Sequence, residues 1–178
     1  MLLDPPGAKR AFITSTIGTG NLGAWADAGG ATGIAAGDAI CAARADAAGL
    51  DGTFRAWLSD ANIDAIDRLP SDGPWVRIDG AAIAADKAGL AAGALLANPL
   101  VTEDGTYLVP LGGGGESLVW TGTLADGTRA AQSCQGWTSA RSSDSGLEGF
   151  ITYLLPSWTE NGPAECDSSW LHLYCFEE

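Results

Sequence analysis

The sequence of 178 residues is poor in basic side chains: it has 9 lysines and arginines against 22 aspartates and glutamates, and a formal net charge of -13. Proteins that bind phosphate backbones or anionic lipid surfaces gather Lys and Arg side chains into clusters. The composition therefore predicts that this chain binds no nucleic acid. Its acidic residues are dispersed singly, which is typical of a solvated surface that keeps a protein soluble. A calcium-binding acidic patch is the alternative interpretation.

Histidine and long apolar runs are also scarce. The one histidine is His172, and no two cysteines stand in a Cys-x-x-Cys pair, so the sequence predicts no zinc site. No apolar run approaches the ~18 residues that a membrane-spanning helix needs, so we expect no membrane insertion by this domain. Residues 1–6 have neither the basic region nor the apolar stretch of a secretory signal. For an extracellular chain, we therefore expect that a leader or a larger parent protein was removed.

The most informative residues that the chain does contain are its four cysteines, Cys41, Cys134, Cys166 and Cys175. Four cysteines allow three pairings, and the sequence leaves all of them open. The nested pairing of Cys41 with Cys175 and of Cys134 with Cys166 has a topological rationale, because the outer bridge would anchor the C-terminus to an early helix. Each bridge would be worth roughly 4 to 5 kcal/mol in the chain-entropy model, not additively. Four buried thiols in a cytosolic protein are the alternative.

The hydrophobic pattern predicts an α+β fold with short, mostly antiparallel strands, two helices and long loops. We expect residues 1–10 to be a lead-in or linker and residues 11–178 to form one domain. Strands are predicted at 11–16, 53–58, 75–78, 117–122, 151–155 and 170–176. Helices are predicted at 38–48, which would end at Gly49, and at 60–69.

Two glycine-containing stretches have a weaker pattern. The Ala- and Gly-rich stretch 81–97 is expected to be largely irregular. The four glycines at 112–115 predict a flexible connector, because no Lys-Ser/Thr follows them as it would in a phosphate-binding loop. By contrast, the last predicted strand alternates cleanly, with Leu171, Leu173 and Cys175 on one face and Trp170, His172 and Tyr174 on the other.

Short motifs along the second half of the chain occur in an order found in a known family. They are Val119-Trp120-Thr121-Gly122, Asp126-Gly127-Thr128-Arg129, Cys134-Gln135-Gly136-Trp137, Cys166 and Leu173-Tyr174-Cys175-Phe176-Glu177. This order resembles the endostatin version of the C-type-lectin-like fold. The resemblance implies that fold, and it implies the nested pairing that loop closure alone only makes plausible.

The first half is similar to bacterial endostatin-like surface proteins, a group that includes the leptospiral endostatin-like lipoproteins. The matching segments are Phe12-Ile13-Thr14-Ser15, Gly20-Asn21-Leu22-Gly23, residues 36–41 and Gly52-Thr53-Phe54-Arg55-Ala56-Trp57-Leu58-Ser59. This resemblance implies a location outside the cell or on a bacterial surface, as part of a larger or lipid-anchored protein. It also implies binding of, or adhesion to, other macromolecules.

Three family properties do not carry over to this sequence. Animal endostatins use an N-terminal histidine cluster for zinc and an arginine-rich face for heparin, and the chain has neither, so we expect no zinc and no heparin binding. Calcium-dependent lectins place an acidic residue before a Pro-Asn or Pro-Asp pair and also carry Trp-Asn-Asp. Here Asn98-Pro99 lacks the preceding acid, and Trp170 is followed by Leu171. A calcium-dependent lectin is therefore only a third alternative, and no cofactor is expected.

The sequence predicts a binding module rather than an enzyme. His172 is a candidate general base, but it lies between two leucines and no nucleophile motif accompanies it. We expect the chain to contact an extracellular protein or glycan through the long loops at 81–115 and 141–165. Trp25 and Trp158, in loops bounded by Gly or Pro, are expected to be exposed and to form the ligand surface with Glu160. A structural or self-assembling module of a larger surface protein or filament is the alternative.

Overall fold

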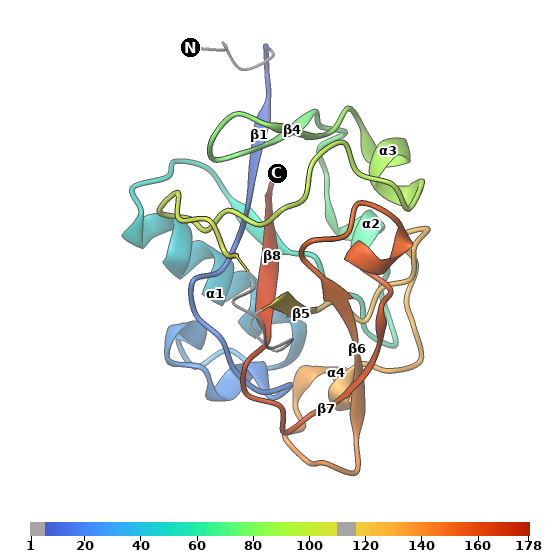
Figure 1. Cartoon of the computed structure of the whole chain (residues 1–178). Helices are drawn as coiled ribbons and strands as arrows, with labels where there is room; N and C mark the ends of the chain where they lie inside the picture. Colours follow the sequence, from blue (N-terminus) through green and yellow to red (C-terminus); the bar gives the residue numbers. More distant parts are fainter. Residues whose placement is uncertain (1–5, 110–116) are drawn as a thin grey trace.

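Strand β8 (His172–Glu177), the last of the chain, lies in the middle of the computed structural model, which describes residues 6–109 and 117–178 (Figure 1). On one side β8 pairs antiparallel with β1 (Lys9–Ile13). On the other side it pairs antiparallel with β2 (Phe54–Ala56) near its end and parallel with β5 (Leu118–Trp120) near its beginning. The C-terminal strand is therefore central to the sheet and not at its edge.

Four further strands extend the sheet to both sides. They are β3 (Trp75–Arg77), β4 (Ala82–Ala84), β6 (Ser145–Phe150) and β7 (Gly162–Glu165). The order is β4-β3-β1-β8-β5-β6-β7, with β2 also paired to β8. The pairs β1 with β3 and β5 with β8 are parallel, and the other pairs between named strands of the described residues are antiparallel. The predicted α+β class with a mostly antiparallel sheet is confirmed.

Among the described residues the long helix is α1 (Gly33–Ala47), and it packs against β2 and β8. It ends as predicted, because Gly49 adopts the left-handed conformation that terminates helices, at φ 68°. The other helical segments are one or two turns long: α2 (Ala65–Arg68), α3 (Lys87–Ala91) and α4 (Cys134–Trp137). Short 3-10 turns occur at η1 (Leu22–Ala24), η2 (Ala26–Ala28) and η4 (Pro156–Trp158).

Each face of β8 is buried in its own apolar cluster. Leu171, Leu173 and Cys175 belong to the cluster under α1, whereas Tyr174 and Phe176 belong to the cluster on the other face. The second cluster is rich in aromatic side chains, notably Trp57, Trp75 and Trp158. The alternation predicted for the last strand is confirmed, and burial on both faces explains the continuous apolar run Leu173-Tyr174-Cys175-Phe176.

Two nested disulfides bond the helices α1 and α4 to segments near the C-terminus. Cys41 of α1 bonds to Cys175 of β8, with their Cα atoms 5.6 Å apart, and Cys134 of α4 bonds to Cys166 after β7, with their Cα atoms 5.7 Å apart. Both separations are ordinary for disulfides. The outer bridge joins α1 to the central strand, so a covalent bond links the two elements that enclose the first apolar cluster.

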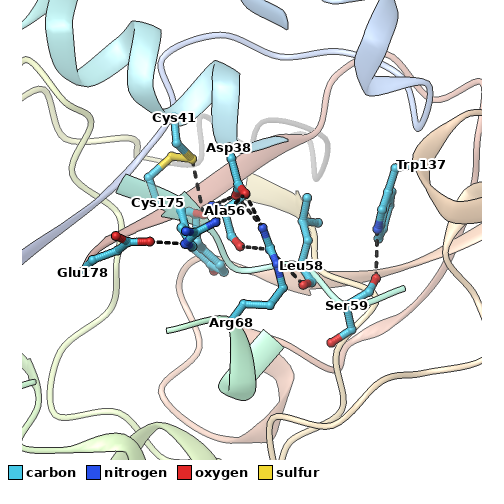
Figure 2. Close-up of polar contacts among 11 residues, drawn as sticks. Asp38, Cys41, Ala56, Leu58, Ser59, Arg68, Trp137, Cys175 and Glu178 are labelled. Carbon is cyan, nitrogen blue, oxygen red and sulfur yellow. Dashed lines mark hydrogen bonds and ion pairs between the residues drawn. A yellow bond between two sulfur atoms is a disulfide. The ribbon is translucent and has the colours of Figure 1, made fainter. Parts of the chain in front are cut away.

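A buried ion pair next to the outer disulfide fixes α2 to the rest of the fold. Figure 2 shows the Arg68 side chain pointing towards Asp38 of α1, and its guanidinium donates to both carboxylate oxygens at 2.5 and 2.6 Å. The same guanidinium donates to the carbonyl oxygens of Ala56 and Leu58 at 2.6 and 3.1 Å. The Arg55 guanidinium also contacts the Oδ2 atom of Asp38, at 3.2 Å. These contacts account for the acidic residue in the middle of α1 as a structural partner.

Three expected elements differ from the observed ones. Residues 151–155 form turns rather than a strand, and the strands of that region are instead β6 and β7. The helix expected at 60–69 is only the turn α2, because the Asp60 carboxylate accepts the N–H groups of Asn62 and Ile63 and so forms a separate turn. The stretch 81–97, expected to be largely irregular, contains β4 and α3.

Two further expectations concern the chain ends and the connector. Strand β1 begins at Lys9, inside the range 1–10 that was expected to be a linker. The expected connector at 112–115 lies outside the described residues. Within 6–109 and 117–178, no helix is both long enough and apolar enough to cross a membrane.

Candidate binding site

The two tryptophans expected at the ligand surface are buried, so that prediction is wrong. Trp158 is 0% exposed and packs against Trp57 and Tyr174, with ring centroids 5.3 and 5.6 Å away. Trp25 is 9% exposed, and its indole N–H donates to the carbonyl oxygen of Thr19 at 2.9 Å. Short 3-10 turns turn both side chains inward.

Glu160, the third residue expected at the ligand surface, is exposed. Its carboxylate accepts the backbone N–H of Ala125 at 2.8 Å, which ties the segment after η4 to a neighbouring turn. With both tryptophans in the core, Glu160 has no aromatic neighbour from the expected set, and the structure does not bring the three residues together as one surface.

A different set of exposed apolar side chains does gather in one place. Ile17, Tyr107, Val109 and Trp170 are 49%, 50%, 67% and 48% exposed. Together with Ser15, Leu108 and His172 they line a groove of about 370 Å³, which we call the Trp170 groove. A mostly apolar cavity of this size with a few polar groups is the usual form of a ligand site. Apolar side chains that cluster on a surface mark interaction sites more often than isolated ones do.

Three segments far apart in the sequence build the Trp170 groove, and backbone hydrogen bonds fix all of them. The segment after β1 is held to the start of β8 by the N–H of Gly18, which donates to the carbonyl oxygen of Leu171 at 3.0 Å. The loop that carries Tyr107 is held to β1 by the N–H of Ile13, which donates to the carbonyl oxygen of Val101 at 3.0 Å. The groove walls therefore rest on the central strands of the sheet.

Polar groups at the base of the groove are already engaged. The Nδ1 atom of His172 lies 2.6 Å from the carbonyl oxygen of Thr14, which orients the imidazole ring. The backbone N–H of Ser15 donates to the buried carboxylate of Glu103 at 2.9 Å, and the Ser15 hydroxyl donates to the same carboxylate. Ser15 and His172 both line the groove, and these contacts direct the Ser15 hydroxyl towards Glu103 and His172 Nδ1 towards the backbone at Thr14.

Tyr107, one wall of the groove, is positioned by the turn after β3. Its hydroxyl donates to the Asp79 carboxylate, and the Arg77 guanidinium lies 5.5 Å from its ring centroid. Arg77 also donates to Asp79, at 2.6 Å. The hydrogen bonds from Arg77 and Tyr107 lower the pKa of Asp79 to about 2, and the bond to Asp79 raises the pKa of Tyr107. The ring is thus held by an ionised carboxylate at all physiological pH values.

A second kind of site lies at α4. Two polar clefts, of about 550 and 510 Å³, share Gln135 and Asp144 as lining residues. Between them the backbone of Cys134, Gln135 and Trp137 is left-handed, with φ of 47°, 56° and 65°. Each such residue costs about 1 to 3 kcal/mol when it is not glycine. The inner disulfide and the Trp137 indole, which donates to the carbonyl oxygen of Ser59 at 2.9 Å, hold this turn.

The two loops expected to form the working surface contribute unequally to these sites. Residues 107–109 of the loop 81–115 line the Trp170 groove, whereas residues 143–145 of the loop 141–165 line a polar cleft. Ile17 and Trp170 lie in neither loop and were missed. Trp170 follows the polar residues Asp167-Ser168-Ser169, but the buried Trp158 follows Pro156-Ser157, so this position gave no usable signal of exposure.

Among residues 6–109 and 117–178, no three His, Cys, Asp or Glu side chains come together so that they could hold a metal ion. Comparison with models of known protein families finds no match, and comparison with curated protein sequences finds none either.

Proposed function

We propose that this chain is a non-catalytic binding module that acts outside the cell or on a bacterial surface and binds an extracellular protein through the Trp170 groove. The observation that carries the proposal is the gathering of Ile17, Tyr107, Val109 and Trp170, all about half exposed or more, around one groove. Aromatic side chains that fill or line such grooves dominate the energetics of protein interfaces.

The two disulfides support the extracellular location, because such bonds form and persist in oxidising compartments. We assign the fold to the endostatin-like branch of the C-type-lectin-like class. Two features support the assignment: the first helix is bonded to the last strand by the outer disulfide, and Cys134 and Cys166 form the inner one. The order of the motifs from Val119 to Glu177 supports it independently.

The non-catalytic part of the proposal is supported by the state of the polar groups in the groove. The Ser15 hydroxyl donates to Glu103, and His172 Nδ1 is engaged by the backbone at Thr14. The Trp170 and Tyr107 rings, in contrast, are presented to solvent on a rigid base, which limits the entropy lost when a partner covers them.

A binding screen with a pair of matched variants tests the proposal. The probes are purified matrix proteins, namely collagens, laminin and fibronectin, each immobilised beside an array of neutral and charged glycans. We expect at least one matrix protein to bind the wild-type chain. Trp170→Ala should weaken that binding at least about tenfold, since hot-spot truncations cost 2 kcal/mol or more.

The control is Leu96→Ala, which removes an apolar side chain that is 67% exposed and does not line the Trp170 groove. It should leave binding unchanged. Binding that survives Trp170→Ala but is lost with Leu96→Ala would contradict the groove assignment. Binding to glycans alone would replace the proposed protein partner with a sugar.

Self-assembly into a larger surface structure is the second candidate function. It is favoured by the Leu155 patch, which we define as the adjoining residues Tyr153, Leu154 and Leu155, each 38% exposed or more. If the patch joins copies of this chain, sedimentation velocity should detect oligomers at about 100 μM that Leu155→Ser abolishes. A monomer at that concentration would remove this candidate.

A further inference from the structure

We infer that the segment that occupies the Trp170 groove is a cationic peptide, with Lys or Arg side chains among its apolar ones. This inference rests on the proposed function and adds the chemistry of the partner. It starts from the groups that border the groove, which are acidic on the Ser15 side: Glu103 contacts Ser15 there, whereas Asp79, which contacts Tyr107 on the other wall, is paired with Arg77.

The acidic border on the Ser15 side continues beyond the groove. A smaller cavity of about 160 Å³ shares Ser15 with the Trp170 groove and is also lined by Glu103, Asp104 and Arg44. Arg44 is already paired with Asp27, at 3.2 Å, and lies 3.7 Å from Glu103. The Arg44 guanidinium is therefore shared between the carboxylates of Asp27 and Glu103, and these three side chains together have a net charge of -1.

Asp104 adds a second negative charge to this side. Its carboxylate accepts the hydroxyl of Thr102 at 2.6 Å and the N–H of Thr106 at 3.0 Å, and both partners are neutral. These hydrogen bonds lower the pKa of Asp104, so it stays ionised. On the Tyr107 side, Arg77 and Asp79 balance each other. Counted against Arg44 and Arg77, the carboxylates of Asp27, Asp79, Glu103 and Asp104 exceed the guanidiniums by two charges.

The apolar walls and the acidic border together select the partner. An apolar segment alone would satisfy the walls, but it would gain nothing from the excess negative charge at Asp104. An acidic segment would be repelled both by the border and by the chain's formal net charge of -13. A segment that alternates apolar and basic side chains fills the groove and places its charges near Glu103 and Asp104. The long-range field of the chain also speeds its approach.

Peptide binding with charge-matched probes tests the inference. Three coumarin-labelled octapeptides alternate leucine with lysine, with glutamate or with serine, and fluorescence anisotropy measures their affinities. We expect the lysine peptide to bind at least about tenfold more tightly than the glutamate peptide at ~0.05 M salt, with the serine peptide between them. The ratio should shrink at ~0.5 M salt, where charges are screened within about 4 Å.

Two variants that each remove one negative charge distinguish local attraction at the groove from attraction by the overall negative charge of the chain. Asp104→Asn should weaken the lysine peptide about two- to fivefold, which is the effect of one exposed charge pair. Asp67→Asn, an exposed carboxylate on α2 that lines no part of the groove, should leave the affinity unchanged. Equal effects of the two variants would overturn the inference, because the attraction would then come from the overall charge.

The outcomes also distinguish this inference from the proposed function. If Trp170→Ala weakens all three peptides but lysine and glutamate peptides bind equally, the groove binds apolar segments and the cationic inference is wrong. If Trp170→Ala leaves the affinity for the lysine peptide unchanged, the peptides bind elsewhere, and both the inference and the groove assignment fail. Circular dichroism of each variant checks that the fold is intact.

Discussion

Replacing Asp38 by alanine removes the one carboxylate that neutralises a buried guanidinium. The Arg68 side chain is 5% exposed, so it would retain only the carbonyl oxygens of Ala56 and Leu58 as partners. Truncating one partner of a buried ion pair typically costs about 3 to 5 kcal/mol. The Asp38 side chain is 23% exposed, which lets water replace part of the lost contact, so we expect a loss of about 3 kcal/mol.

The assay is urea unfolding followed by tryptophan fluorescence, with both disulfides intact. For a chain of this size, about 3 kcal/mol corresponds to a melting temperature lower by roughly 6 to 12 °C. Asp67→Ala, at an exposed site on α2, is the control and should change stability by less than about 0.5 kcal/mol. A loss below about 1 kcal/mol for Asp38→Ala would refute the role assigned to the pair.

A double variant separates the charge from the packing. Replacing Asp38 by leucine and Arg68 by methionine removes both charges and keeps apolar volume. Such replacements of whole buried ion pairs are often neutral. The double variant should therefore recover more than half of the stability lost in Asp38→Ala. If it is as unstable as the single variant, the loss comes from the other contacts of the two side chains, which are those of Arg68 with the backbone and those of Asp38 with Arg55 and the Ala56 N–H.

Three further predictions concern the bridges, the core and acid stability. Reduction should increase the intact mass by about four units, and a peptide that joins Cys41 to Cys134 would contradict the observed pairing. Trp158→Ala should cost about 3 to 5 kcal/mol, whereas Leu155→Ala should change stability by less than about 0.5 kcal/mol; similar losses would show that Trp158 is not in the core. The pKa of Asp79 is lowered from 3.8 to about 2, so its contribution to stability is present above about pH 4 and is lost as the pH falls towards 2. Accordingly, Asp79→Asn should be less stable than the wild type near neutral pH and should match it near pH 2, and a constant difference would exclude the titration of Asp79 as the cause.

The sequence predicted the elements whose residues are buried in a regular pattern. The last strand alternates between two apolar clusters, and α1 ends at a glycine in the left-handed conformation, so local pattern and tertiary packing agree there. The nested disulfides, implied by the family resemblance, are observed as well. Such agreement is expected where one residue type satisfies both the backbone and the core.

The prediction failed at β6 because its glycines suggested a loop. A Cβ atom at Gly149 would lie 2.0 Å from the carbonyl oxygen of Trp158, and one at Gly146 would lie 2.8 Å from the Sγ atom of Cys134. Glycine is therefore present because other parts of the chain approach the strand closely, not because the backbone turns. A strand was predicted at 151–155 instead, although Tyr153, Leu154 and Leu155 of that stretch are exposed. Neither the close approach to the glycines nor the exposure of these three side chains can be predicted without knowing which distant residues pack against them.

The binding surface could not be predicted from the sequence because tryptophan carries no sign of its own exposure. Trp158 and Trp170 both follow short polar or Pro-containing segments, yet the first is buried against Trp57 and the second is half exposed. What separates them is whether the neighbouring turn points into the aromatic cluster or away from it. The short turn η4 points inward, and the extended segment before β8 runs along the surface.

The position of the Trp170 groove at the beginning of β8 has a mechanical consequence. From His172 onwards the strand is buried on both faces, paired on both sides and bonded to α1 through Cys175, so its path is fixed by the core. Trp170 stands just before this region, where the core no longer covers the side chain. A large aromatic ring exposed on such a base gains its burial only when a partner arrives, and little ordering of the chain then opposes binding. The scaffold stability and the groove affinity should therefore vary independently, because the residues that set the one are not those that set the other.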